Sequence, residues 1–361
     1  MKCTIQNIAD HLGLSRNTVS KALKNSSEVS ENTRNLVIKT ASKLGYKNAT
    51  FATPVIPASE TGSNGTILFL TRTYASDSEF WTTVLRGIES ILSNANYHLA
   101  ISIMSDSDLK QLNFPQTISD SSIKGIILVE ICDKVVCDAL SQFNLPIVSV
   151  DMPNVPFEEL NGIDVVTMES KKNLKKIINQ LIEKGAESFG FVGDLYSPNV
   201  SRGFQERYNA LSECLAEHQL PLNQKNCLLH QTPEDFRNFQ TTVNNLQAMI
   251  SLPDVFICGN DWTAIQLIYA LQFLGFQIPK DICVVGFDNI PAASRISPSL
   301  TTISTPQKYL GIAAARQILE RIQHPNCPHV FCQYETELII RNSTNIISCL
   351  LYTSDAADEG L

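Results

Sequence analysis

The sequence lacks the long apolar runs and the paired cysteines that mark several large classes of protein. None of its apolar runs reaches the roughly 18 residues that a transmembrane helix requires. The first residues contain no apolar segment of the kind found in secretory signals. The 10 cysteines include no CxxC pair, which argues against a disulfide framework and against structural zinc. We therefore expect a cytoplasmic protein.

Short motifs of catalysis and cofactor binding are also missing. There is no GxGxxG after an apolar strand, no GxxxxGK[ST], no HExxH and no GxSxG. None of the 6 histidines has a partner at the spacing that metal ligands need. We expect no enzymatic activity, no cofactor and no bound metal, and a binding function is favoured instead.

Charge is distributed unevenly along the chain. Residues 1–47 contain eight basic and three acidic side chains, a balance of +5, so the total of −8 leaves −13 for the remainder. At 361 residues the chain is too long for one core, and several folding units are expected. A basic N-terminal segment (residues 1–47, the head) followed by an acidic remainder (the body) predicts that the head binds a polyanion.

The head has the pattern of three short helices. An amphipathic stretch follows Thr4, a capping residue, and ends at Gly13, a residue type that terminates helices. Ser15 is placed to cap a second helix that runs to about residue 23, and Ser30 is placed to cap a third. A helix, a tight turn with glycine and a second helix form the helix-turn-helix arrangement, in which the second helix enters the DNA major groove.

The side chains of the second helix suit that groove. Arg16 and Asn17 lie at its start, where they can read guanine and adenine through paired hydrogen bonds. Short hydroxyl side chains around them suit phosphate oxygens, which fix the register of the helix on the duplex. Lys21 can reach a base or a phosphate. The complete set that we expect at the DNA is Thr4, Ser15, Arg16, Asn17, Thr18, Ser20, Lys21, Ser30, Thr33 and Arg34.

The head also resembles a known family. The stretch "TIQNIADHLGLSRNTVSKALKNSSEVSENTRNLVIKTASKLGY" is similar to the DNA-binding head of the lac repressor and galactose repressor family of bacterial transcription regulators. The matching elements are T-I-x-x-I-A, G-L-S-x-x-T-V-S-K-A-L, V-S-x-x-T-R and L-G-Y. In that family the segment after the head forms a hinge helix with a leucine wedge in the minor groove. Here Pro54 and Pro57 flank Val55, the residue nearest the leucine position, so a flexible tether is expected instead over residues 48–65.

From residue 66 onward, short apolar runs alternate with helical patterns. This alternation predicts an α/β body with parallel sheets covered by helices on both faces. Two Rossmann-like lobes are expected, with a ligand cleft at the carboxyl ends of the strands. Asp151, Asn260 and Asp288 follow apolar runs and would face that cleft, although a capping or turn role is the commoner fate of such residues.

The body resembles the sugar-binding part of the same family, which has the type I periplasmic-binding-protein architecture. The stretches that match the family are "GNDWTAIQLIYALQFLGFQIPKDICVVGFDN" and "SPSLTTI". The resemblance implies that Asn260 and Asp288 contact an effector and that Asp261 caps the next helix. It also implies that Arg207, in "ERYNAL", binds the effector. The set expected at the effector is Phe80, Trp81, Asp151, Arg207, Asn260 and Asp288, and Phe80 and Trp81 are also candidates for the core.

These inferences predict a domain order. We expect a helix-turn-helix domain at 1–47, a linker at 48–65, a body at 66–344 and a disordered or extraneous tail at 345–361. Lobe one would hold residues 66–164 and 304–324, and lobe two residues 165–303 and 325–344. The chain would cross between lobes near Asp164, Thr302 and Pro325.

The function that follows is a sequence-specific transcription regulator, expected to be a repressor. Its partners would be a near-palindromic double-stranded DNA operator, a second copy of the chain and a small-molecule effector of the sugar class. Two other classes compete with it. A sugar-binding solute receptor would share the body but not the basic head, and an enzyme on a Rossmann-like sheet would need motifs that the sequence lacks.

Overall fold

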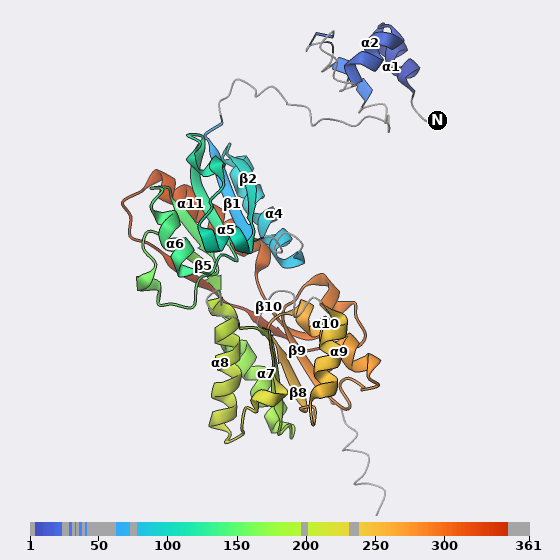
Figure 1. Ribbon diagram of the computed structural model, residues 1–361, viewed down its shortest axis with the longest axis vertical. Coiled ribbons are helices and arrows are strands. Elements are labelled where there is room, and N and C mark those ends of the chain that lie inside the picture. The colour runs from blue at the N-terminus through green and yellow to red at the C-terminus, as the bar shows by residue number, and fades with distance from the viewer. Residues whose placement is uncertain are drawn as a thin grey trace, which may run out of the picture. The chain divides into compact units, whose positions relative to one another are not determined.

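The computed structural model describes residues 4–23, 29–30, 33, 36–37, 40–41, 63–72, 78–195, 201–230 and 238–345 (Figure 1). The chain divides into two compact units, Met1–Gly62 and Ser63–Leu361. Arg34, residues 48–62 of the predicted linker and residues 346–361 of the predicted tail lie outside the described residues. Among the residues that are described, no helix is long and apolar enough to cross a membrane.

The first unit contains the predicted helices. Helix α1 spans Ile5–Leu12 and helix α2 spans Arg16–Leu23. Thr4 caps α1 by accepting a hydrogen bond from the backbone N–H of Asn7, and Gly13 ends the helix in a left-handed conformation with φ 63°. Parts of a third helix are described at 33, 36–37 and 40–41. The small core shared by these elements consists of Ile8, Ala9, Val19, Ala22, Val29, Val37 and Ala41.

The second unit contains two lobes, each built on a six-stranded sheet. The first sheet has the order β11-β5-β4-β3-β1-β2, and all of its strand pairs are parallel. Its strands are β1 (Thr66–Arg72), β2 (His98–Met104), β3 (Ile123–Val129), β4 (Ile147–Val150), β5 (Asp164–Met168) and β11 (Phe331–Tyr334). Its helices are α4 (Glu79–Asn94), α5 (Asp106–Gln111), α6 (Lys134–Ser141) and α11 (Gln307–Gln323).

The second sheet has the order β12-β10-β9-β8-β6-β7, and only its β10–β12 pair is antiparallel among the described strands. Its strands are β6 (Phe189–Asp194), β7 (Leu228–His230), β8 (Val255–Cys258), β9 (Cys283–Asp288), β10 (Thr301–Ser304) and β12 (Glu337–Ile339). Its helices are α7 (Lys172–Glu183), α8 (Arg202–Glu217), α9 (Phe239–Ala248) and α10 (Asp261–Phe273).

Most central strands are buried along nearly their whole length, as expected for parallel sheets covered on both faces. The predicted fold class, a helix-turn-helix head with a two-lobed α/β body, is therefore confirmed. Figure 1 shows that α11, which is late in the sequence, lies in the lobe of β1. There it packs on α4.

The predicted positions of two lobe crossings are wrong. Strand β5 pairs with β4 in the first sheet, so the chain leaves the first lobe after Met168 and not near Asp164. Strand β11 pairs with β5, so the last crossing lies between Tyr334 and Glu337 and not near Pro325. The middle crossing, between β10 and α11, lies just beyond Thr302.

A buried ion pair explains the first error. Asp164 is 0% exposed, and its carboxylate receives two hydrogen bonds from Arg321, at 2.8 and 2.9 Å, and one from the backbone N–H of Val330. The charge of an aspartate is tolerated inside a protein when it is paired and hydrogen-bonded in this way. The residue therefore begins a buried strand, although its charge suggests an exposed connection.

Candidate DNA-binding surface and ligand cavity

The second helix of the head presents its predicted contact residues to solvent. Val19 and Ala22 of α2 are buried in the core, whereas Arg16 and Asn17 on its first turn are exposed. This division follows from the amphipathic pattern, because one face of the helix packs on α1 and the other is left for a partner. Both side chains named for base contacts are thus accessible at the start of the helix.

The hydroxyl residues of the head also form helix caps. Ser15 Oγ accepts a hydrogen bond from the backbone N–H of Thr18 at 3.0 Å, and Ser30 Oγ accepts one from the N–H of Thr33 at 3.4 Å. In each pair the two hydroxyl groups also lie 2.8 Å apart. These contacts orient the starts of two helices, while Thr4, Ser15 and Ser30 remain exposed. Ser20 and Lys21 are half-buried on α2.

The second unit contains a cavity of about 670 Å³ lined from both of its lobes. Strand ends supply Arg72 from β1, Glu130 after β3 and Asp151 after β4 in the first lobe, and Asp194 from β6 and Asp288 from β9 in the second. All six residues predicted for the effector line this one cavity: Phe80, Trp81, Asp151, Arg207, Asn260 and Asp288. The cavity therefore lies at the carboxyl ends of parallel strands, where ligands of such folds bind.

Three of the acidic residues have a left-handed backbone. The φ angles are 56° at Glu130, 77° at Asp151 and 116° at Asp288. Positive φ is uncommon for residues other than glycine and costs roughly 1–3 kcal/mol each. Such conformations concentrate at functional sites, where the surrounding structure holds a side chain in a required place. Here they occur where three strands end beside the cavity.

Arg207 is buried beneath the cavity. Its side chain is 3% exposed, and its Nη1 donates a hydrogen bond to the backbone oxygen of Gly259 at 2.6 Å. The guanidinium lies 3.6 Å from the centroid of the Phe287 ring, a cation–π contact. Burial lowers the pKa of Arg207, and the nearby Asp288 carboxylate opposes this. The Nε atom is buried and has no hydrogen-bond partner among the described residues.

Glu130 joins the two aromatic residues of the first lobe to the cavity. The indole N–H of Trp81 donates a hydrogen bond to Glu130 Oε1, and the Trp81 and Phe80 rings meet edge to face at 4.6 Å. Phe80 and Trp81 also belong to the main core, so the core and cavity interpretations both hold for them. Burial raises the pKa of Glu130 to about 7, opposed by the Trp81 hydrogen bond and by Arg72.

Asp151 and Asp288 approach the cavity from different lobes. Asp151 Oδ1 accepts a hydrogen bond from the backbone N–H of Met152 at 2.8 Å. Burial raises the pKa of Asp151, and a hydrogen bond from Ser201 opposes it. Burial raises the pKa of Asp288 well above its usual range, and Arg207 opposes that shift. Both carboxyl groups therefore gain from a partner that donates hydrogen bonds or carries positive charge.

The roles expected for Asn260 and Asp261 are partly exchanged. Asn260 caps α10, because its side chain accepts a hydrogen bond from the backbone N–H of Thr263 at 2.9 Å. Asp261 is 0% exposed and accepts hydrogen bonds from the Thr302 hydroxyl and from the backbone N–H of Ile290. The cap position precedes the first helical residue, and here that position is Asn260. Asn260 still lines the cavity, whereas Asp261 holds the loop after β9 against β10.

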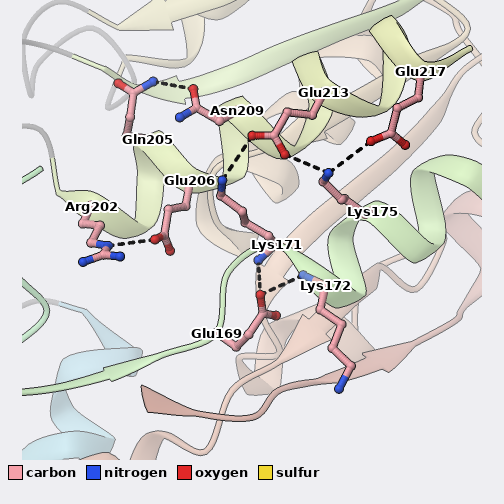
Figure 2. Close-up of polar contacts among 10 residues, drawn as sticks. All are labelled: Glu169, Lys171, Lys172, Lys175, Arg202, Gln205, Glu206, Asn209, Glu213 and Glu217. Carbon is pink, nitrogen blue, oxygen red and sulfur yellow. Dashed lines mark hydrogen bonds and ion pairs between the residues drawn. The ribbon is translucent and has the colours of Figure 1, made fainter. Parts of the chain in front are cut away.

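Ion pairs between α7 and α8 support the helix that carries Arg207 (Figure 2). Lys175 lies 2.7 Å from Glu213 and 3.5 Å from Glu217, and Lys171 lies 3.2 Å from Glu213. Each exposed pair contributes only about 0–1 kcal/mol. Their position along one side of α8 helps to fix the direction of that helix against α7, and hence the place of Arg207.

Sequence reasoning missed several residues of the cavity. Arg72 and Glu130 follow buried strand residues, as Asp151 and Asp288 do, and the same strand-end rule would have found them. Trp262, on the first turn of α10, also lines the cavity and is 40% exposed. No spacing in the sequence distinguishes Trp262 from the core residues of that apolar helix.

Comparisons with known proteins cover both units. Residues 4–48 match the family described as bacterial regulatory proteins, lacI family, and residues 178–344 match the periplasmic binding protein-like domain. The ribose operon repressor of Haemophilus influenzae is 27% identical over 344 residues, which are 94% of this chain and 98% of that protein.

Two solved structures share the fold. A complex of the transcriptional regulator CelR with cellobiose has a TM-score of 0.66 at 19% identity, over 95% of this chain and 100% of that one. The lac repressor dimer bound to operator and the anti-inducer ONPF has a TM-score of 0.65 at 20% identity, over 95% and 99% of the two chains.

A helix-turn-helix head on a two-lobed body with a cavity at the strand ends defines a DNA-binding transcription regulator of the ligand-responsive class. The chain thus combines a helix-turn-helix head that matches the lacI family of bacterial regulatory proteins with a body that matches the periplasmic binding protein-like domain.

Proposed function

We propose that the protein is a repressor that binds a near-palindromic operator as a homodimer, and that a small sugar-like effector in the cavity controls its affinity for DNA. One observation carries the proposal. Strand-end carboxylates, a buried arginine and aromatic side chains converge on one cavity of about 670 Å³, in a chain that also carries a helix-turn-helix head.

The head would read the operator through the exposed turn of α2. We assign base contacts to Arg16 and Asn17, and phosphate contacts to the hydroxyl groups around them and to Lys21. Thr4, Ser30, Thr33 and Arg34 would add phosphate contacts. We place the head at residues 1–47 and the body at 66–344, with the lobe boundaries corrected as above.

The cavity has the polar groups that a polyhydroxylated ligand needs. Carboxylates accept hydrogen bonds from hydroxyl groups, and Arg207 can donate to a ligand oxygen through Nε. The aromatic rings of Phe80, Trp81 and Trp262 line the same space and suit the apolar faces of a sugar ring. The similarity in fold to the regulator CelR, solved with cellobiose, supports a sugar as the ligand class.

Exposed apolar side chains on the body support the homodimer. Ile101 and Ile103 on the edge strand β2 are 54% and 47% exposed, and Tyr269 and Phe273 on α10 are 44% and 68% exposed. Exposed apolar groups of this size favour a protein partner, and twofold symmetry would give two heads for two half-sites. The lac repressor of similar fold is a dimer on its operator. A regulator of this kind would act in the cytoplasm.

Effector and operator would be coupled through lobe closure. A ligand that contacts both lobes changes how they face each other, and so changes the spacing of the two heads in the dimer. Coupling of this kind is reciprocal and typically amounts to about 1–3 kcal/mol.

The test combines operator selection with cavity variants. An operator is selected from random DNA by the intact protein, and a sugar panel is screened by thermal shift. Arg207→Ala and Asp288→Asn are expected to bind the operator normally without ligand and to lose the effect of ligand on DNA affinity. Arg295→Ala, which replaces an exposed arginine outside the cavity, should respond as the wild type does. A normal ligand response in both cavity variants would refute the assignment.

A further inference from the structure

The cavity carries an excess of negative charge. Five acidic side chains line it, namely Glu79, Glu130, Asp151, Asp194 and Asp288, against the two arginines Arg72 and Arg207. Arg72 is already paired with Asp106 at 2.7 Å. Among the carboxylates near Arg207, that of Asp288 raises the pKa of the guanidinium most, so Arg207 interacts most strongly with Asp288. The carboxyl groups are therefore only partly neutralised by the protein itself.

These carboxyl groups also disfavour each other's charge. The pKa of Glu130 is raised first by burial and further by Asp151 and Asp194. The pKa of Asp288 is raised first by burial and further by Asp261, Glu130 and Asp151. A cation placed among them would relieve this repulsion, whereas a phosphate or carboxylate on a ligand would add to it.

Glu130 presents a specific acceptor to such a cation. Its Oε1 receives the indole N–H of Trp81, while its Oε2 is buried with no hydrogen-bond partner among the described residues. Leaving a buried acceptor unsatisfied costs about 1–3 kcal/mol, and more for a charged group. The left-handed backbone at Glu130 fixes the residue at the end of β3, beside the cavity.

Aromatic rings complete a site suited to an ammonium group. Phe80, Trp81, Phe204 and Trp262 line the same cavity as Glu130. A cation near the face of a tryptophan ring is stabilised by about 0.5–2 kcal/mol, depending on how far it is removed from water. A carboxylate with an unpaired oxygen beside the Trp81 indole, in a cavity lined by further aromatic rings, therefore favours a protonated amine over a neutral hydroxyl group.

We propose that the effector is an amino sugar or a similarly hydroxylated amine, and that Glu130 is the specificity-determining residue that receives its ammonium group at Oε2. The inference rests on the proposed function and narrows its ligand class. The hydroxyl groups of the ligand are left for Asp151, Asp288 and Arg207.

Matched sugars test the proposal on the wild-type chain. Isothermal titration calorimetry with the full-length protein compares glucosamine, galactosamine and mannosamine with the parent hexoses, the N-acetylated forms and the hexose 6-phosphates. At least one amine is expected to bind about tenfold or more tightly than its parent hexose, and the phosphates more weakly still. A neutral or phosphorylated sugar that binds as tightly as its amine would overturn the proposal, as would no binding by any amine at millimolar concentration.

A conservative substitution tests the residue assignment. Glu130→Gln keeps the size of the side chain and removes its charge, and it is expected to reduce the preference for the amine to about twofold or less. Glu89→Gln, on the exposed side of α4 and outside the cavity, should keep the wild-type preference. A full amine preference in Glu130→Gln would overturn the role of Glu130. If this variant does not fold, the ligand ranking on the wild type still decides the ligand class.

Release of the operator by ligands distinguishes a failure of the amine proposal from a failure of the proposed effector control. If a neutral or phosphorylated sugar binds and releases the operator, the proposed regulator stands and the amine proposal fails. If no sugar of any charge alters operator binding, the proposed effector control itself fails.

Discussion

At the scale of single residues, the cavity is distinguished by acidic side chains whose buried surroundings disfavour the ionised form. Glu130 is the clearest case, because its pKa is raised from 4.5 to about 7 by burial. Trp81 and Arg72 stabilise its charged form, and Asp151 and Asp194 destabilise it. At a pH between 4.5 and about 7, Glu130 is therefore protonated in the folded protein and ionised in the unfolded chain.

This difference predicts a pH dependence of stability. A folded-state pKa above the unfolded value gives a contribution that is fully present below pH 4.5 and is lost as the pH rises through about 7. The shift corresponds to at most about 3 kcal/mol for Glu130. Glu130→Gln is therefore expected to lose less stability than the wild type between those pH values, measured by chemical denaturation.

The comparison of variants isolates Glu130 from other titrating groups. Asp261, whose pKa is also raised to about 7 by burial, keeps contributing in the variant, so the slope is reduced and not removed. Glu89→Gln should follow the wild-type curve, since Glu89 is exposed. Parallel curves for the wild type and Glu130→Gln would contradict the burial of this carboxylate.

At the scale of elements, the first lobe depends on a close crossing of α4 and α11. A Cβ atom at Gly311 would lie 2.0 Å from the backbone oxygen of Val84, and one at Gly87 would lie 2.2 Å from that of Lys308. Backbone atoms cannot yield as a flexible side chain does. Helices α4 and α11 can therefore approach this closely only because Gly87 and Gly311 have no Cβ atom.

Gly311→Ala is expected to destabilise the body. Forcing the helices apart costs about 1–3 kcal/mol or more, which exceeds the gain of roughly 1 kcal/mol that alanine brings to a helix. Gly203→Ala in α8 is the matched control, because its Cβ would meet only ordinary contacts at 3.5 Å or more. Thermal unfolding would show a lower midpoint for Gly311→Ala and an unchanged or higher one for Gly203→Ala. Equal midpoints would contradict the close crossing.

Elements whose stability is local were predictable from the sequence. The periodicity after Thr4, Ser15 and the buried runs of the body marked helices and strands, because capping and burial act over a few residues. The strand-end rule placed Asp151, Asn260 and Asp288, and the family resemblance placed Arg207, in regions that the structure gathers at one cavity.

Features that depend on distant partners were not predictable in the same way. Asp164 is paired with Arg321, which lies 157 positions later, and the sequence alone does not reveal that partner. The contact of Trp81 with Glu130 joins residues 49 positions apart. The lobe boundary and the hydrogen bonding of the Glu130 carboxylate both depend on such long-range contacts.

At the scale of the whole molecule, two properties must coexist in one chain. The head needs exposed basic and polar side chains for DNA, and the body needs a cavity with several acidic side chains for its ligand. The net charges of +5 for residues 1–47 and −13 for the rest separate these tasks, since the total is −8. Repulsion between the acidic body and DNA would leave contact with the duplex to the head.

Selective DNA binding by the intact protein tests the central claim most directly. A gel-retardation assay with genomic fragments at low ionic strength compares the wild type with Arg16→Ala and Asn17→Ala. The wild type is expected to retain a few fragments selectively, and the two variants a changed set of fragments, because these side chains are assigned to base edges. If the intact protein retains no fragment selectively, its assignment as a sequence-specific regulator is contradicted.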